Sequence, residues 1–327
     1  MRSYGVNVDA RPVVTVQYDA APPAELGSIS ADAELRMVPS SELAEALSGA
    51  DVLFVYDFSS PALRSAWPAA DALRWVQVAA LGVDAVLCDE LIDSDVVLTN
   101  SRGIFEEPIA EYVLGQILAF AKGFRRSRLA QDAHRWQHFD TEQIAGAAVT
   151  IVGPGPVGRA IARLLRAAGM TVRGVGRTGR EDPDFGVIGT DLVEAVADAD
   201  YVVLAAPLTP HTRGLLDADV LAAMPARARL INVGRGELVD TDALLAAMVA
   251  GRLAGAALDV VDPEPPPPDH PVWTTPNLHL TPHHSGDVHG WTSALQQQFI
   301  ANFRRYVSGQ PLHNVVDKQR GYARSGA

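Results

Sequence analysis

The stretch VTIVGPGPVG, from Val149 to Gly158, decides the fold of this chain. Four β-compatible residues lead into Gly153, Gly155 and Gly158, which stand at G-x-G-x-x-G spacing. The next segment, RAIARLLRAAG, places its apolar residues on one helical face, and TVRGV behind it is typical of a second strand. The order strand, glycine turn, helix, strand predicts a βαβ unit with an anion site at the amino end of its helix.

Each glycine of this turn has a separate task in such a unit. Gly153 allows the tight turn, Gly155 allows the backbone to approach a pyrophosphate, and Gly158 allows the helix to pack closely on the strand. Pro156 has no N–H group to offer, although proline suits the first turn of a helix. We therefore expect the backbone N–H of Val157 to contact the pyrophosphate.

Length and composition limit the class of protein. The 327 residues suffice for two domains with a core each, and 48% hydrophobic with 20% charged residues is typical of a soluble globular chain. The net charge of −12 disfavours nucleic acid and acidic membranes as partners. The single cysteine, Cys88, excludes an internal disulfide, and no Cys/His cluster suggests a metal. Without a visible signal segment, a cytoplasmic protein is the expectation.

Strands and helices alternate along the chain, which predicts parallel α/β sheets. One long helix is expected over 106–131, and a last amphipathic helix over 289–314 is expected to return to the first domain. We predict a substrate-binding domain from residues 1–101 and 287–327 and a dinucleotide-binding domain from residues 102–286. Buried strands of the first sheet are predicted at 13–18, 51–56, 73–80 and 96–100, and those of the second at 149–152, 171–175, 201–207, 228–234, 255–261 and 277–283.

Three strands of the second sheet are followed by groups that can take part in a reaction. INVGRG delivers Arg235, LDVVDPEP delivers Asp259 and Glu264, and LTPHHSG delivers His283. The carboxyl ends of strands in a doubly wound sheet meet at the crevice that also holds the glycine turn. This convergence, rather than any single residue, predicts an active site there.

Five ordered motifs complete the pattern: GPGPVG (153–158), PLTPHTRGLL (207–216), NVGRGELVD (232–240), GAALDVVDPEP (255–265) and NLHLTPHHSG (277–286). With them the chain resembles the D-isomer-specific 2-hydroxyacid dehydrogenases over nearly its whole length. PLHNVVDKQRGY and NSRGIFEEPIAEYVLG are most similar to the glyoxylate/hydroxypyruvate reductase-like branch. The resemblance implies an α/β fold in which a Rossmann-type doubly wound parallel sheet is inserted into a flavodoxin-like substrate domain.

The resemblance also implies roles for individual residues. The family's arginine, glutamate and histidine fall on Arg235, Glu264 and His283, and its nicotinamide-orienting aspartate falls on Asp259. It implies an oxidoreductase that transfers a hydride between a nicotinamide cofactor and a 2-oxoacid/D-2-hydroxyacid pair, with glyoxylate or hydroxypyruvate as expected substrates, and a homodimer formed through the dinucleotide domain. Further cofactor-binding residues are expected at Ala206, Pro207, Thr212, Val233 and Gly286.

The residue types agree with this chemistry. Imidazole titrates near physiological pH, so His283 is the expected acid, and Glu264 beside it would favour the imidazolium. The planar fork of Arg235 can hold a carboxylate and stabilise charge on a carbonyl oxygen. His283 is preferred to its neighbour His284 because it follows Thr-Pro, as in the family motif. Leu81 and Gly82, in the loop ALGVD, are expected to donate their N–H groups to the substrate carboxylate.

The end of the second strand of the βαβ unit predicts the cofactor. Sites that prefer NAD place an acidic residue there, about 20 residues after the glycines. Gly176 stands in that place, and Arg177, Thr178 and Arg180 follow it. No carboxylate repels a phosphate, whereas two guanidinium groups and a hydroxyl can bind one. The prediction is NADP(H) over NAD(H), with Arg177 as the main discriminator.

Two alternatives to this activity stay open at the level of sequence. Some relatives with this fold resemble corepressors that sense the dinucleotide and turn over little, so the fold alone does not guarantee catalysis. Phosphite oxidation uses a similar set of residues. Formate dehydrogenase-like proteins lack a glutamate partner for the histidine, and Glu264 argues against that class.

Overall fold

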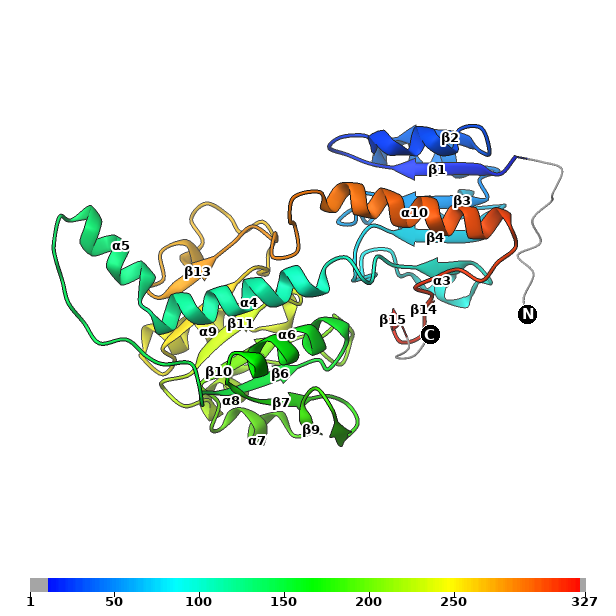
Figure 1. The fold of residues 1–327 in the computed structure, drawn as a ribbon. Coiled ribbons are helices and arrows are strands. Elements are labelled where there is room, and N and C mark those ends of the chain that lie inside the picture. Colours follow the sequence, from blue (N-terminus) through cyan, green and yellow to red (C-terminus); the bar gives the residue numbers. More distant parts are fainter. Residues whose placement is uncertain (1–10, 324–327) are drawn as a thin grey trace. The chain divides into compact units, whose positions relative to one another are not determined.

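The computed structural model describes residues 11–323, which form two compact units. The first unit combines the chain up to Ile104 with the chain from Val288 onward, and the second runs from Phe105 to Asp287. Each unit is a parallel α/β sheet with helices, and the second is inserted into the chain of the first (Figure 1). The expected fold class is confirmed. No helix within residues 11–323 is long and apolar enough to cross a membrane.

The first unit has a five-stranded sheet in the order β2-β1-β3-β4-β5, which is the flavodoxin-like order. All of its strand pairs are parallel. The edge strand β2 escaped the sequence analysis because it is only half-buried and carries charged side chains. The elements are β1 (Val13–Gln17), β2 (Glu34–Val38), α1 (Leu43–Leu47), β3 (Val52–Val55), α2 (Ala62–Ala66), β4 (Trp75–Val78), α3 (Asp89–Asp93), β5 (Val97–Thr99), α10 (Trp291–Val307), β14 (Val316–Asp317) and β15 (Tyr322–Ala323).

The helix α10, from the far end of the chain, completes the core of this unit. Figure 1 shows it lying along β3 and β4. Phe299 stacks on Phe54 with ring centroids 4.3 Å apart and on Trp75 at 5.2 Å. All three side chains are fully buried, and burying each aromatic ring stabilises the fold by about 2–3 kcal/mol. The first unit therefore depends on both ends of the chain.

The second unit has an eight-stranded sheet in the order β13-β12-β11-β10-β6-β7-β9-β8. Only the β8–β9 hairpin is antiparallel, and it was not predicted. The strands are β6 (Ala148–Val152), β7 (Thr171–Val175), β8 (Arg180–Asp182), β9 (Gly186–Gly189), β10 (Tyr201–Leu204), β11 (Arg229–Asn232), β12 (Gly255–Leu258) and β13 (Leu278–Leu280). The helices are α4 (Glu106–Ala121), α5 (Phe124–Asp132), α6 (Pro156–Ala167), α7 (Leu192–Val196), α8 (Ala218–Ala223) and α9 (Thr241–Val249).

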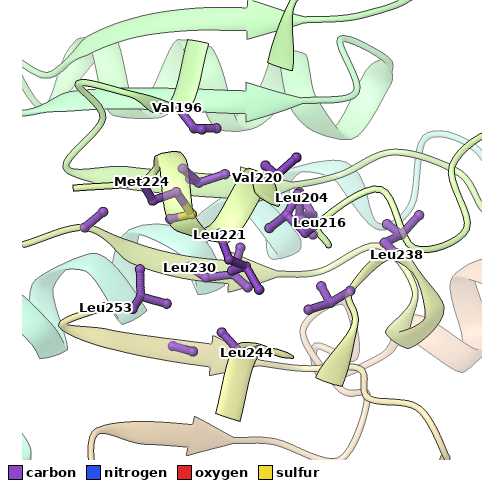
Figure 2. Packing of buried hydrophobic residues seen from close by; sticks show 14 of the residues in the cluster. Val196, Leu204, Leu216, Val220, Leu221, Met224, Leu230, Leu238, Leu244 and Leu253 are labelled. Atoms are coloured by element: carbon purple, nitrogen blue, oxygen red, sulfur yellow. The ribbon is translucent and has the colours of Figure 1, made fainter. Parts of the chain in front are cut away.

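One face of this sheet is covered by α7, α8 and α9. Their leucine, valine and methionine side chains interlock with those of β10 to β12, as Figure 2 shows. All three helices begin at aspartates, Asp191, Asp217 and Asp240, whose carboxylates accept backbone N–H groups of the first turn. Such a cap is worth about 1 kcal/mol. The capping aspartates and the packing of the apolar side chains thus both favour helices that begin at these positions.

The single helix expected over 106–131 is wrong in one respect, because the chain forms two helices there. Gly123 separates α4 from α5 and has a left-handed backbone with φ of 61°. A side chain at Gly123 would also strike the ring of Phe139, whose Cε2 lies 2.7 Å from the place of a Cβ. We call residues 124–141, which project from the unit, the arm (Figure 1).

Candidate active site

The glycine turn between β6 and α6 has the geometry of an anion site. Gly153 has φ of +100°, and a Cβ there would lie 2.6 Å from the backbone of Ala206. A Cβ at Gly158 would lie 2.2 Å from the carbonyl oxygen of Gly153, so only glycine lets α6 pack on β6. Beside Gly155, by contrast, no atom lies within 4 Å of the Cβ place.

The open space at Gly155 lies directly before the first turn of α6. Pro156 is the first helical residue, so the next backbone N–H of the helix belongs to Val157. A helix start of this kind favours an anion through its dipole and its unpaired N–H groups. The residues at this turn therefore fit a dinucleotide pyrophosphate.

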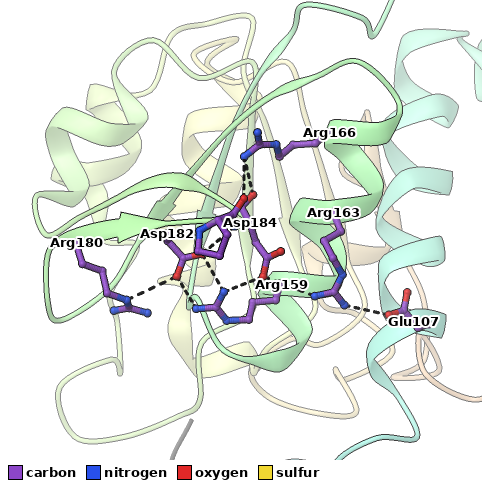
Figure 3. A network of polar contacts seen from close by, with 8 residues as sticks. Glu107, Arg159, Arg163, Arg166, Arg180, Asp182 and Asp184 are labelled. Atoms are coloured by element: carbon purple, nitrogen blue, oxygen red, sulfur yellow. Dashed lines mark hydrogen bonds and ion pairs between the residues drawn. The ribbon is translucent and has the colours of Figure 1, made fainter. Parts of the chain in front are cut away.

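The segment after β7 was expected to bind a ribose phosphate. Gly176 directly follows the strand, and Arg177, Thr178 and Arg180 are all exposed. Arg180 is partly committed elsewhere, because its Nε lies 3.7 Å from Oδ2 of Asp182 (Figure 3). Among the three predicted groups, Arg177 and Thr178 stand nearest to the end of β7 in the chain.

The loop after β11 carries Arg235. The side chain of Asn232 fixes this loop by accepting the N–H of Gly234 and donating to the carbonyl oxygen of Arg235, at 3.0 and 2.8 Å. The next residue, Gly236, packs so closely on Val261 that a Cβ would lie 2.1 Å from its carbonyl carbon. The loop with Arg235 therefore lies against the segment that leads from β12 to Glu264.

The loop after β13 brings His283 to Glu264. Nδ1 of His283 donates to Oε1 of Glu264 at 2.7 Å, with 30% and 41% of the two side chains exposed. His283 has a left-handed backbone with φ of 50°, which is uncommon for residues other than glycine. Because Glu264 accepts the hydrogen bond from Nδ1, the carboxylate fixes the orientation of the imidazole ring.

Asp259 contacts the loop that carries His283. Its side chain is buried, and its carboxylate accepts three hydrogen bonds, from the hydroxyl of Thr281 at 2.7 Å and from the N–H groups of His284 and Ser285 at 3.0 Å each. The carbonyl oxygen of Asp259 also accepts the N–H of His283 at 2.8 Å. Asp259 therefore holds the loop that presents His283.

Two residues that sequence reasoning missed adjoin this loop. The hydroxyls of Tyr112 and Thr281 are 2.6 Å apart, and burial raises the pKa of Tyr112 to about 12. Burial also raises the pKa of Asp287, against the opposing effect of His283. Tyr112 lies 169 residues before Thr281 in the chain, so no local pattern could pair them.

The remaining predicted residues lie in or next to loops that follow strands or connect to them. Ala206 is buried against Gly153, and the hydroxyl of Thr212 donates to the carbonyl oxygen of Pro207 at 2.7 Å, which closes that loop. Val233 precedes the Arg235 loop and is half-buried. Gly286 packs on Phe105, whose Cδ1 lies 2.7 Å from its Cβ place. In the first unit, the loop with Leu81 and Gly82 follows β4, and Asn100 donates to the carbonyl oxygen of Leu81 at 2.8 Å.

Comparison with known proteins agrees with this geometry. The family model described as D-isomer specific 2-hydroxyacid dehydrogenase, NAD binding domain, matches residues 114–285. A glyoxylate/hydroxypyruvate reductase A from Arabidopsis thaliana is 30% identical over 247 residues, which cover 75% of this chain and 78% of the relative.

Two solved structures are similar over almost the whole chain. A D-isomer specific 2-hydroxyacid dehydrogenase from Xanthobacter autotrophicus Py2, in complex with NADPH and MES, has a TM-score of 0.82 and 30% identity and covers 96% of this chain and 100% of its own. An NADPH-dependent glyoxylate/hydroxypyruvate reductase from Sinorhizobium meliloti, in complex with NADP and sulfate, has a TM-score of 0.78 and 29% identity with the same coverage. The chain therefore belongs to the D-isomer-specific 2-hydroxyacid dehydrogenases, a family of NAD(P)-dependent oxidoreductases, and to their glyoxylate/hydroxypyruvate reductase-like branch.

Proposed function

We propose that this enzyme reduces a small 2-oxoacid, such as glyoxylate or hydroxypyruvate, to the D-2-hydroxyacid with NADPH. The observation that carries the proposal is the 2.7 Å pair of His283 and Glu264, placed at neighbouring strand ends with Arg235. In this pair His283 is the acid, and the carboxylate of Glu264 orients its ring. The named relatives described above are reductases and dehydrogenases, so the corepressor alternative gains no support from them.

The proposed chemistry follows from the residue types. When bound, the dinucleotide supplies a hydride to the carbonyl carbon of the oxoacid. Glu264 fixes the tautomer of His283 and stabilises its imidazolium, so that Nε2–H donates the proton to the developing alkoxide. Arg235 polarises the carbonyl group and pairs with the carboxylate of the substrate. Asp259 keeps His283 in place through the loop.

The two units take different tasks in this proposal. The second unit binds the dinucleotide through Gly153, Gly155, Val157 and the strand-end loops. The first unit binds the substrate, with the backbone N–H groups of Leu81 and Gly82 as donors to its carboxylate. We also place the enzyme in the cytoplasm, a reducing compartment that suits the buried free thiol of Cys88.

The preference for NADPH is supported by the end of β7. Gly176 offers no carboxylate there, and the exposed Arg177 and Thr178 can contact a phosphate on the adenosine ribose. Two of the similar solved structures were obtained with NADPH or NADP. The arm supports a homodimer, because Phe124 and Leu129 are each 58% exposed and Trp136 is fully exposed.

The experiment that tests the proposed function follows the oxidation of NADPH and NADH in parallel with glyoxylate, hydroxypyruvate, pyruvate and phenylpyruvate. Rapid NADPH oxidation with the small oxoacids is the expected result. An efficiency at least tenfold higher with NADH would overturn the cofactor assignment alone. No turnover with any oxoacid, together with tight NADPH binding, would overturn the substrate assignment and favour a binding protein.

A further inference from the structure

The ring of Pro154 lies over Gly176, the residue at the end of β7. A Cβ at Gly176 would lie 2.8 Å from Cγ and 3.0 Å from Cδ of Pro154, closer than a Cβ can approach. Ile188 Cγ2 closes another side at 3.4 Å. Gly176 has no left-handed backbone, so its own conformation does not demand glycine. Glycine is required at this position because the ring of Pro154 leaves no space for a Cβ.

Neither residue can move away from the other at low cost. Gly153 donates its N–H to the carbonyl oxygen of Val175, and Gly176 donates its own to that of Gly189, both at 3.0 Å. These bonds tie the glycine turn to one side of β7 and the hairpin strand β9 to the other. The end of β7 is thus held between two neighbours, and Pro154, being cyclic, has no flexible end that could turn aside.

An ion-pair network fixes the position of the β8–β9 hairpin (Figure 3). Arg159, in the first turns of α6, donates to both oxygens of Asp182 at 2.9 and 2.6 Å and to Asp184 at 2.8 Å. The side chain of Asp182 is only 3% exposed, and the guanidinium of Arg159 lowers its pKa. Because α6 also carries the glycine turn at its start, the network fixes the hairpin and Pro154 to one rigid frame.

We propose that Pro154 is a determinant of cofactor selectivity that acts by exclusion. A dinucleotide site that prefers NAD needs a carboxylate at the position of Gly176, and the proline ring leaves no room for its Cβ. The selectivity is then set by a pair, Pro154 and Gly176, and not by the arginines alone. A change of preference to NADH requires both positions to change. This inference rests on the proposed preference for NADPH.

The steric part of the proposal is tested without any cofactor. Gly176→Ala, Pro154→Ala and the double variant are compared by thermal unfolding, with Gly189→Ala as the control. Gly189 lies on the neighbouring strand, has no left-handed backbone and has no atom within 4 Å of its Cβ place. Overpacking in Gly176→Ala should lower the Tm by about 3–10 °C, whereas Gly189→Ala should change it little.

The double variant decides whether the clash involves Pro154. Gly176→Ala should lower the Tm of the Pro154→Ala variant by less than half of the amount by which it lowers the Tm of the wild type. An equal loss in both backgrounds, or no loss in Gly176→Ala, would overturn the steric pair. This result does not depend on which cofactor the enzyme prefers.

The selectivity part is tested by the binding of NADH and NADPH, measured as the change in nicotinamide fluorescence. Gly176→Asp alone should bind NADH no better than the wild type. Pro154→Ala/Gly176→Asp should bind NADH about 10–100-fold more tightly than Pro154→Ala does, because its carboxylate can accept the ribose hydroxyls. A full gain in Gly176→Asp alone would overturn the proposal. If the wild type preferred NADH, the proposed cofactor would be wrong, but the result of the Tm comparison would still hold.

Discussion

The backbone N–H of His283 donates a 2.8 Å hydrogen bond to the carbonyl oxygen of Asp259, whose carboxylate binds the two residues that follow the histidine. A buried carboxylate with three donors is costly to disturb, because each lost bond leaves an unsatisfied charge in the interior. The left-handed turn at His283 is therefore maintained by Asp259. The direction of the His283 imidazole, the proposed acid, therefore depends on Asp259.

Tyr112 contacts the Asp259 carboxylate indirectly, through the hydroxyl of Thr281. Since Thr281 gives its only hydroxyl proton to Asp259, the tyrosine hydroxyl must be the donor to Thr281. Tyr112→Phe should lower kcat about three- to tenfold with little change in the KM for the oxoacid, and should cost about 1 kcal/mol of stability. Steady-state kinetics and chemical denaturation measure the two effects separately.

Tyr201→Phe provides the matched control for that variant. Tyr201 is a buried tyrosine of the second unit, but it stands at the amino end of β10, whereas Glu264 and His283 follow the carboxyl ends of their strands. Removal of the Tyr201 hydroxyl should leave kcat unchanged. If both variants lowered kcat to the same extent, Tyr112 would have no positioning role.

The two arginines that we propose as phosphate-binding residues should differ in their effect. Arg177→Ala should raise the KM for NADPH about 10–100-fold and leave the KM for NADH nearly unchanged, because only NADPH carries the extra phosphate. Arg180→Ala should have a smaller effect, since that guanidinium also pairs with Asp182 at 3.7 Å. Initial rates with both cofactors check this order, and a larger effect of Arg180→Ala would reverse the assignment.

The arm should be an interface between two copies of the chain. With a chain mass of 34.8 kDa, light scattering should give about 70 kDa, twice that value. Trp136→Ser should weaken the dimer by about tenfold or more, as expected for a buried aromatic anchor. Trp273→Ser is the control, since Trp273 is also exposed but lies outside the arm. A monomeric wild type would refute the interface.

The stability of the enzyme should fall in mildly acidic solution because of His279. Its ring stacks on Phe120 at 4.4 Å, and burial lowers its pKa from the usual 6.5. The unfolded chain therefore takes up a proton below about pH 6.5 that the folded chain resists, so the free energy of unfolding decreases as the pH falls, by up to about 1.4 kcal/mol per pH unit.

His279→Gln should reduce that loss between pH 7 and 5, as measured by urea unfolding at each pH. His313→Gln is the matched control because His313 is exposed and lies outside the arm. If the pH dependence of His279→Gln equalled that of the wild type, proton uptake at this residue would not cause the loss.

Much of the site could be predicted from the sequence because its parts follow strand ends. Gly153, Arg235 and His283 follow the ends of β6, β11 and β13, and a parallel sheet brings such ends together. The hydrogen bonds of Asp259 could not be predicted, because they come from N–H groups of a loop more than twenty positions away. Pro154 and Gly176 likewise meet only when β6 and β7 are paired in register.

The errors in the predicted elements have local physical causes. The helical pattern continues through Gly123, but the left-handed backbone of that glycine and the ring of Phe139 end α4 there. The β8–β9 hairpin lacks a hydrophobic alternation of its own, since both of its strands are largely exposed. Its position depends on Arg159, which lies on α6 and is remote in sequence.

The most direct test of the account is the rate of NADPH oxidation with glyoxylate by the wild type and by His283→Asn and Glu264→Gln. The account predicts rapid turnover by the wild type, a fall in kcat of about 10²–10⁴-fold in His283→Asn, and a smaller fall in Glu264→Gln. NADPH binding should persist in both variants. Turnover by His283→Asn within a few-fold of the wild type would contradict the assignment of the acid and, with it, the proposed mechanism.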